Sequence, residues 1–132
     1  MAGYSATPLA AKLGIRSNST LVILGAPPEI SFDLPPTVVV RHRALGPADV
    51  VVVFNTRAES LRRVVESLCQ LIFPDGGLWI AWPKKSSGLA TDITDHVVRE
   101  LALALGLVDN KVCSIDETWT GLRLVWRREN RH

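Results

Sequence analysis

The sequence predicts an α/β domain of three layers, in which helices cover a mostly parallel β-sheet. Short runs of aliphatic and β-branched residues alternate along the chain with stretches of helical apolar spacing. The runs are uniformly apolar, which is typical of strands buried on both faces. The last two runs are joined only by residues 116–121, too few for a parallel crossover. We therefore expect about six strands, mostly parallel, with an antiparallel strand at the C-terminal end.

The first elements are a short helix and a strand. Thr7 is suited to the N-cap of this helix, Pro8 to its first position and Gly14 to the position just past its end. Residues 20–24 form a continuous apolar run that predicts a buried strand. Residues 26–28, Ala-Pro-Pro, cannot continue a central strand because proline has no N–H to donate.

Two further strands are expected at residues 37–40 and 49–54, followed by a long helix. The tetrapeptide Thr56-Arg-Ala-Glu59 matches a capping box, in which the threonine and glutamate side chains satisfy free N–H groups at a helix start. Apolar residues then recur at helical spacing, which predicts an amphipathic helix over residues 57–72.

The second half predicts one more helix and three strands. Residues 78–82 read as a buried strand, and apolar residues spaced by four predict a helix over 92–105 that stops at Gly106. Strands are then expected at 108–115 and 122–128. Together these elements place residues 1–132 in a single domain.

Composition excludes several classes of protein. At 47% hydrophobic and 21% charged residues, the chain is typical of a folded domain, and its net charge of +2 gives no strong attraction to nucleic acid or membranes. No apolar run is long enough to span a membrane, and the N-terminus lacks the pattern of a signal peptide. Cys69 and Cys113 have no metal-binding spacing and stand in apolar contexts typical of buried thiols. We expect a cytoplasmic protein without a membrane partner.

The stretch after residues 78–82 is the strongest candidate site. It combines lysines, hydroxyl groups and a glycine just before an expected helix start at Thr91 and Asp92, where N–H groups and the helix dipole attract anions. Gly25 and Arg41 should lie at the same edge of the sheet. The alternative is a solvated loop whose lysines favour solubility. The candidate residues for a small anionic ligand are Gly25, Arg41, Lys84, Lys85, Ser86, Ser87, Gly88 and Thr91.

Aromatic residues accompany this loop. Trp79 and Trp82 are three residues apart in one strand and should point to opposite faces of the sheet. Trp82 is a candidate cleft residue, with core packing as the alternative. Trp119 stands in the expected hairpin turn, where it either lines a cleft or contacts a partner, or else covers the sheet edge.

No residue pattern predicts catalysis. His42 and His96 stand in no nucleophile motif, and no carboxylate pair has a spacing that requires acid–base chemistry. No cluster has metal-ligand spacing. Asp116 and Glu117 are expected to cap the last hairpin. We therefore predict no catalytic residue, no metal and no cofactor.

The segments Pro74-Asp-Gly-Gly-Leu-Trp-Ile-Ala81 and Gly106-Leu-Val-Asp-Asn-Lys-Val112, followed by an antiparallel return, resemble the C-terminal half of a class I methyltransferase. That family has a Pro-Gly-Gly turn before its fifth strand and a terminal hairpin. The resemblance covers residues 48–128 and implies a Rossmann-like fold.

The N-terminal half departs from that family. Its glycine-rich loop for S-adenosylmethionine corresponds here to Gly25-Ala-Pro-Pro28, and its acidic residue for the ribose hydroxyls corresponds to Arg41. These departures imply a degenerate scaffold that binds neither S-adenosylmethionine nor a nicotinamide cofactor tightly.

A second resemblance is at the level of sequence. The segments 3–15 and 81–88, Thr91-Asp92 and Trp119-Thr-Gly-Leu122 together resemble domain-of-unknown-function family 3052, a small bacterial family of uncharacterised proteins. This resemblance implies a compact bacterial cytoplasmic domain and no established activity.

The sequence favours a non-catalytic ligand-binding or interaction module. The alternative is a small enzyme, either a reduced methyltransferase relative or one that acts on a phosphorylated or acidic small molecule. Nucleic-acid binding is a weaker alternative. It would use basic residues that lack the interleaved aromatics of common RNA-binding modules, namely Arg62, Arg63, Lys84, Lys85, Arg127, Arg128 and Arg131. The sequence does not identify a protein partner.

Overall fold

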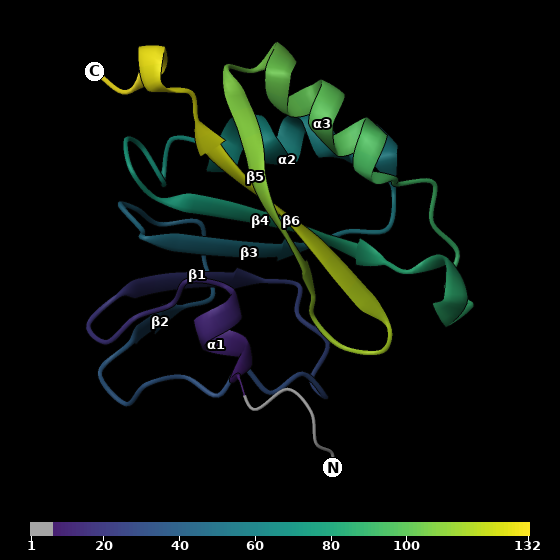
Figure 1. Cartoon of the computed structure of the whole chain (residues 1–132), viewed down its shortest axis with the longest axis horizontal. Coiled ribbons are helices and arrows are strands. Elements are labelled where there is room, and N and C mark those ends of the chain that lie inside the picture. The colour runs from purple at the N-terminus through teal and green to yellow at the C-terminus, as the bar shows by residue number, and fades with distance from the viewer. Residues whose placement is uncertain (1–6) are drawn as a thin grey trace.

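A computed structural model describes residues 7–132 and shows one six-stranded sheet in the order β2-β1-β3-β4-β6-β5 (Figure 1). Residues 1–6, which include the start of the segment 3–15, lie outside the described residues. The strands are β1 (Thr20–Leu24), β2 (Val39–Arg41), β3 (Val50–Phe54), β4 (Gly77–Pro83), β5 (Leu107–Ser114) and β6 (Trp119–Trp126).

The first four strands run parallel, whereas β6 is antiparallel to both of its neighbours, β4 and β5. Leu78 of β4 pairs with Leu124 of β6 in this antiparallel register. The predicted fold class is therefore confirmed, including the antiparallel strand at the C-terminal end.

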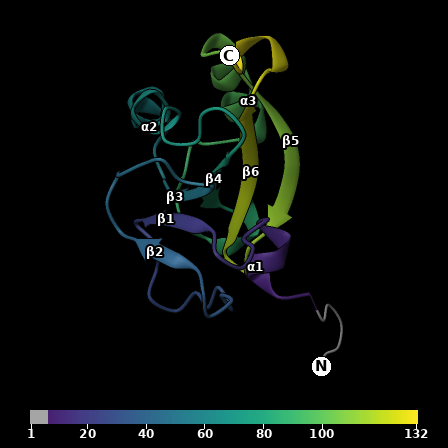
Figure 2. The ribbon, with the colours of Figure 1, turned by 90° about the vertical axis from the view of Figure 1, so that its left-hand side faces the viewer.

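The helices are α1 (Leu9–Lys12), α2 (Leu61–Leu68) and α3 (Asp95–Ala104), with single 3-10 turns η1 (Ala58–Ser60), η2 (Lys85–Ser87) and η3 (Arg128–Asn130). Helices α2 and α3 lie on one face of the sheet and α1 on the other (Figure 2). No helix joins β1 to β2, and apolar side chains of the connecting loop, such as Phe32 and Leu34, cover the α1 face instead. No helix within residues 7–132 is long and apolar enough to cross a bilayer.

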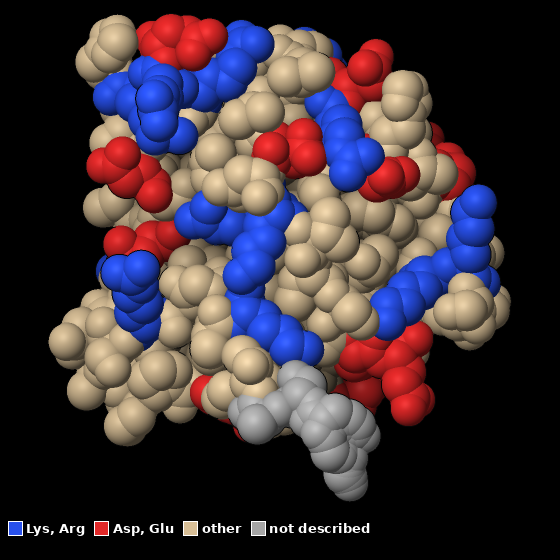
Figure 3. Space-filling model, viewed as in Figure 1, with Lys and Arg blue, Asp and Glu red and all other residues tan. Residues whose placement is uncertain are grey.

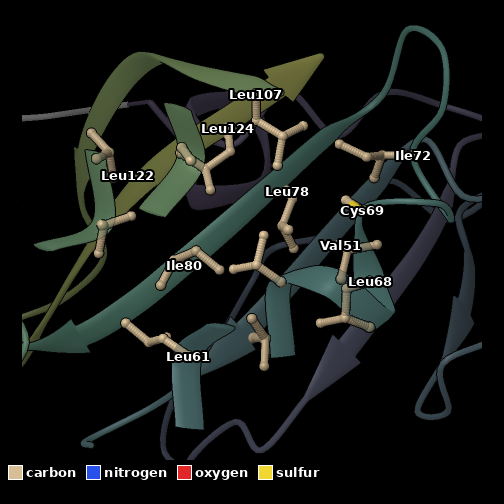
Figure 4. Packing of buried hydrophobic residues seen from close by; sticks show 14 of the residues in the cluster. Val51, Leu61, Leu68, Cys69, Ile72, Leu78, Ile80, Leu107, Leu122 and Leu124 are labelled. Atoms are coloured by element: carbon tan, nitrogen blue, oxygen red, sulfur yellow. The ribbon is translucent and has the colours of Figure 1, made fainter. Parts of the chain in front are cut away.

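Strand β4 is the centre of the molecule, because all seven of its residues are buried. Leu78 and Ile80 pack between Leu61 and Leu68 of α2 on one side and Leu122 and Leu124 of β6 on the other (Figure 4). The alternate residue Trp79 belongs to the cluster on the α1 face, whereas Trp82 belongs to the cluster under α2 and α3. Trp79 and Trp82 thus lie on opposite faces, as the period of two predicts.

Several predicted boundaries were wrong by one to four residues. The helix expected at 57–72 consists of η1 and α2 and ends at Leu68. The last strand begins at Trp119, three residues before its predicted start, because Trp119 pairs with Pro83 across the sheet. At α1, Pro8 in an extended conformation takes the N-cap position expected for Thr7, and Gly14 has the positive φ of +79° expected after the helix.

The capping box predicted at Thr56–Glu59 was wrong. The N–H of Ala58 donates to Asp92 Oδ1, 34 residues away, at 2.7 Å, and Glu59 instead pairs with the exposed Arg57. The hydroxyl of Thr91 donates to the carbonyl of Thr56 at 2.8 Å. The loop before α3 therefore caps the start of η1 and α2, a contact between distant segments that local sequence cannot reveal.

This cap yields a first prediction. Replacing Asp92 with alanine should lower the free energy of unfolding by about 1 kcal/mol, because the N–H of Ala58 loses its side-chain acceptor. Replacing the exposed Thr56 with alanine should change it by less than about 0.5 kcal/mol. Urea unfolding of both variants checks that Asp92 is the cap. A larger loss for Thr56→Ala than for Asp92→Ala would support the local capping box instead.

Both cysteines are free and buried, as their apolar contexts predict. Burial raises the pKa of each thiol above its ordinary value. Since the thiolate is the reactive form, neither cysteine has the environment of a nucleophile.

Candidate functional site at the carboxyl edge of the sheet

The carboxyl ends of β1 and β3 flank the point where the strand order reverses, which is the usual ligand position in open α/β sheets. Gly25 follows β1 with φ of +73°, and a Cβ added there would meet the carbonyl oxygen of Phe54 at 3.4 Å. The ring of Phe54 packs edge-to-face on Trp119 with centroids 5.2 Å apart. Close backbone and aromatic packing therefore occupy this edge.

The residues at this edge do not fit S-adenosylmethionine as the class I methyltransferases hold it. Pro27 and Pro28 offer no N–H to a ligand. At the end of β2, Arg41 can only donate hydrogen bonds, so it cannot accept from ribose hydroxyls as an acidic residue would. Its Nη1 makes only long contacts with its own connector, at 3.4 Å to the carbonyl of Leu45 and 3.5 Å to that of Pro47.

A cavity of about 380 Å³ opens instead at the carboxyl end of β4. The side chains of Trp82, Ile93 and Leu122 line it from three different segments, and Lys84 and Lys85 stand beside it. Val112 of β5 also lines it and is 61% exposed, which is high for a large aliphatic residue. The cavity combines an apolar wall with two cationic side chains.

Lys84 is held by the last hairpin. Its Nζ donates to Ser114 Oγ and to the carbonyl oxygen of Asp116, both at 2.6 Å. The carboxylate of Asp116 accepts from the N–H groups of Thr118 and Trp119 at 2.8 and 2.7 Å, which confirms its expected role in the hairpin. Lys84 thus ties the end of β4 to the β5–β6 turn while keeping its charge beside the cavity.

The rest of the predicted loop is only partly available to a ligand. The hydroxyl of Ser87 donates to the carbonyl of Lys84 at 2.7 Å and accepts from Leu89. Ser86 and Gly88 are exposed, and Gly88 has the left-handed φ of +83°. Of residues 84–88, Lys84 and Lys85 are the two that line the cavity.

Thr91 was wrongly expected to start the helix. Thr94 is the N-cap of α3 and its Oγ1 accepts from the N–H of Val97 at 3.2 Å. Thr91 lines a separate cavity of about 340 Å³ with Thr56 and Arg57. Gly25 and Arg41 line neither cavity. The structure therefore brings Lys84 and Lys85 together with Trp82, and separates Gly25, Arg41 and Thr91 from them.

The two candidate aromatics have different positions. Trp82 is 8% exposed, so it is both a core residue and part of the cavity wall. Trp119 lies in β6, on the α1 face, and packs against Phe54. Trp119 therefore does not line this cavity. The sequence did not point to Val112, Ile93, Thr120 or Leu122 as cavity residues, because they come from β5, β6 and the loop before α3, which are distant in the chain from Lys84.

No metal cluster is found in the described range: within residues 7–132, no three His, Cys, Asp or Glu side chains are placed to hold one ion.

No family model matches this sequence, and no curated protein matches it either. Several solved structures do resemble this protein in fold. A SAM-dependent methyltransferase from Aquifex aeolicus has a TM-score of 0.59 at 12% identity, with 86% of this chain and 85% of that one covered. The ribosomal protein L11 methylase from Lactobacillus delbrueckii subsp. bulgaricus has a TM-score of 0.53 at 11% identity, with 86% and 72% covered.

Magnesium protoporphyrin IX methyltransferase from Synechocystis PCC 6803 with bound SAH has a TM-score of 0.52 at 15% identity. The match covers 69% of this chain, which spans about half (52%) of the length of that enzyme. At these identities the likeness establishes the fold alone. The fold is Rossmann-like and resembles that of the class I methyltransferases.

Proposed function

We propose that this protein is a non-catalytic ligand-binding module that holds a small acid with an apolar body in the cavity beside β4. The observation that carries the proposal is the meeting of an apolar wall, formed by Trp82, Ile93 and Leu122, with the cationic Lys84 and Lys85. The volume of about 380 Å³ lies within the usual range of small-molecule sites.

The charges around the cavity favour an anion. None of the ion pairs in the described part of the chain includes Lys84 or Lys85. Asp95 also lines the cavity, but its carboxylate pairs with Arg99 at 2.7 Å. The hydrogen bond from Arg99 lowers the pKa of Asp95 below its ordinary value. Because Arg99 also pairs with Asp109 at 3.0 Å, it offsets only part of the negative charge of Asp95. The two ammonium groups therefore outweigh the one partly offset carboxylate, and the net charge at the cavity favours an anionic ligand.

The apolar wall supports an apolar ligand body. Transfer of apolar surface from water contributes about 25 cal/mol per Å² buried, so a short hydrocarbon chain against Trp82 and Leu122 would gain several kcal/mol. Val112, exposed at the mouth, would lose contact with water as well. A medium-chain carboxylate matches both halves of the cavity.

Titration calorimetry with octanoate tests the proposal. We expect Lys85→Ala to weaken octanoate binding about tenfold, because one charge-assisted contact is lost. Arg63→Ala removes an exposed positive charge from α2, outside the cavity, and is the matched control. Lys84 is a poorer target, since its bonds to the hairpin make its removal costly to the fold.

A second ligand and a second variant complete the test. Acetate should bind far more weakly than octanoate, and Val112→Glu should abolish octanoate binding by placing a negative charge at the mouth. The proposed site would be refuted if Lys85→Ala and Val112→Glu bound octanoate as tightly as the wild-type protein, or if the wild-type protein did not bind octanoate.

A methyl-transferring enzyme is the second candidate, favoured by the fold likeness to SAM-dependent methyltransferases. We expect titration calorimetry to show no low-micromolar affinity for S-adenosylmethionine or nicotinamide cofactors, because Pro27 and Pro28 stiffen the turn after β1. Low-micromolar binding of S-adenosylmethionine would favour the enzyme. Membership of family 3052, a bacterial source and a cytoplasmic location stay predictions from the sequence.

A further inference from the structure

Another cavity, of about 610 Å³, opens at the opposite, amino edge of the sheet. The turns before β3 and β4 line it together with the start of β1, and Arg123 of β6 contributes a side chain. Arg123 also lines an adjoining cavity of about 210 Å³ with Lys12 and Lys111. Gly14 borders both cavities. Arg123 therefore stands where the two cavities meet.

The guanidinium of Arg123 occupies space that Gly77 leaves free. A Cβ added at Gly77 would lie 2.7 Å from both Cζ and Nη2 of Arg123, and closer still to Nε. The position that begins β4 must therefore be glycine for Arg123 to lie there. The guanidinium therefore lies directly over the backbone of Gly77.

Among the residues that the structure describes, no carboxylate pairs with Arg123. Its hydrogen bond is a long one, from Nη1 to Asn110 Oδ1 at 3.4 Å, and none of the ion pairs within residues 7–132 includes it. Burial lowers the pKa of Arg123 below its ordinary value. Partial burial of an uncompensated charge costs free energy, which the fold would recover if an anion bound there.

Other cations surround Arg123. Lys111 Nζ donates to the backbone carbonyl of Lys12 at 2.9 Å, which brings the β5 lysine next to α1. On the face of the molecule that carries α1, a line of basic side chains runs over α1 and the strands β5 and β6 (Figure 3). No Asp or Glu lines the smaller cavity.

The larger cavity differs in chemistry. Arg16, Asp49 and Asp75 line it, so it offers both donors and acceptors. Asp49 Oδ2 accepts from the N–H of Thr20 at 2.8 Å, and Asp75 is exposed at the rim. A polar, hydroxyl-bearing body suits such a lining, whereas an apolar body does not.

We propose that this edge binds a small phosphate ester, with its phosphate between Lys12, Lys111 and Arg123 and its polar body in the larger cavity. A phosphate carries close to two negative charges and three acceptor oxygens, so it can accept from all three cations at once. This site lies at the opposite edge from Lys85, and it stands independently of the proposed function.

The test uses ribose 5-phosphate, inorganic phosphate and ribose, at constant ionic strength, in thermal-shift and amide NMR titrations. Ribose 5-phosphate should bind at least tenfold more tightly than inorganic phosphate, and ribose should not bind. Amide shifts should gather around residues 12–16, 76–77 and 123. Shifts gathered around Lys85 instead would overturn the assignment.

Arg123→Met separates a binding role from a structural one. The variant keeps an unbranched apolar stem, so without ligand it should melt at the same temperature as the wild type or higher, while losing at least tenfold in ribose 5-phosphate affinity. Lys111→Gln should lose severalfold in ribose 5-phosphate affinity, and Lys85→Ala should bind ribose 5-phosphate as the wild type does.

A less stable Arg123→Met that still binds ribose 5-phosphate normally would refute the proposal. Tighter binding to a ten-nucleotide single strand than to ribose 5-phosphate would also refute it, in favour of a nucleic-acid surface.

Discussion

Replacing Trp79 with alanine should lower the free energy of unfolding by about 4 kcal/mol, the largest loss we expect from a single substitution. Trp79 has no exposed surface, and it fills the α1 side of the central strand β4. Its indole Nε1 donates to the carbonyl of Leu13 at 2.9 Å, which holds the end of α1 against the sheet. Alanine would leave a cavity and an unpaired buried carbonyl. Since most domains are stable by only about 5–15 kcal/mol, this loss is a large fraction of the total stability.

Two matched variants separate these effects in urea unfolding. Trp79→Phe keeps most of the apolar volume but removes the donor to Leu13, and should cost about 2 kcal/mol. Trp126→Phe removes a similar bond, from Nε1 to the carbonyl of Cys69 at 2.9 Å, at a less buried position, and should cost less. A loss below about 2 kcal/mol for Trp79→Ala would mean that α1 is not anchored to β4 as described.

Replacing Gly76 with alanine should lower the free energy of unfolding by about 3 kcal/mol. An added Cβ would lie 2.8 and 2.9 Å from the carbonyl oxygens of Asp49 and Ala48, and 3.0 Å from that of Ile72. These are backbone atoms on both sides of the turn, so the strain cannot be relieved by rotating a side chain. The turns before β3 and β4 would have to separate.

Gly77→Ala is the informative comparison. Its added Cβ meets the tip of the Arg123 side chain, which can swing away, so unfolding should be affected less than in Gly76→Ala. Chemical denaturation followed by tryptophan fluorescence ranks the two variants. Equal losses at Gly76 and Gly77 would show that Arg123 is held as rigidly as the backbone.

The sheet could be predicted from sequence because its signals are local. Uniformly apolar runs such as residues 50–53 identify buried strands, and the short link before Trp119 excludes a parallel crossover. The opposite faces of Trp79 and Trp82 follow from the period of two in a strand. Each of these inferences needs only neighbouring residues.

The contacts that define the sites could not be predicted, because they join distant segments. Asp92 caps a helix that begins 34 residues earlier, and Lys84 bonds to the hairpin around Asp116. The loop lysines could be identified as candidates, but not the Val112 and Leu122 that face them. Nothing in the local sequence distinguishes Arg123 from other strand arginines, since its environment depends on Gly77 in another strand.

The position of β6 also constrains the order in which the sheet can be assembled. Strands β4 and β5 both precede β6 in the chain, yet each uses β6 as a neighbour. As the chain leaves the ribosome, the outer edge of β4 and the whole of β5 therefore lack their strand partner until residues 119–126 have been synthesised. Exposed strand edges of this kind have unpaired N–H and C=O groups that can pair with other chains and cause aggregation. A nascent chain stalled before Trp119 should need protection by a chaperone, whereas release of β6 should complete both pairings at once.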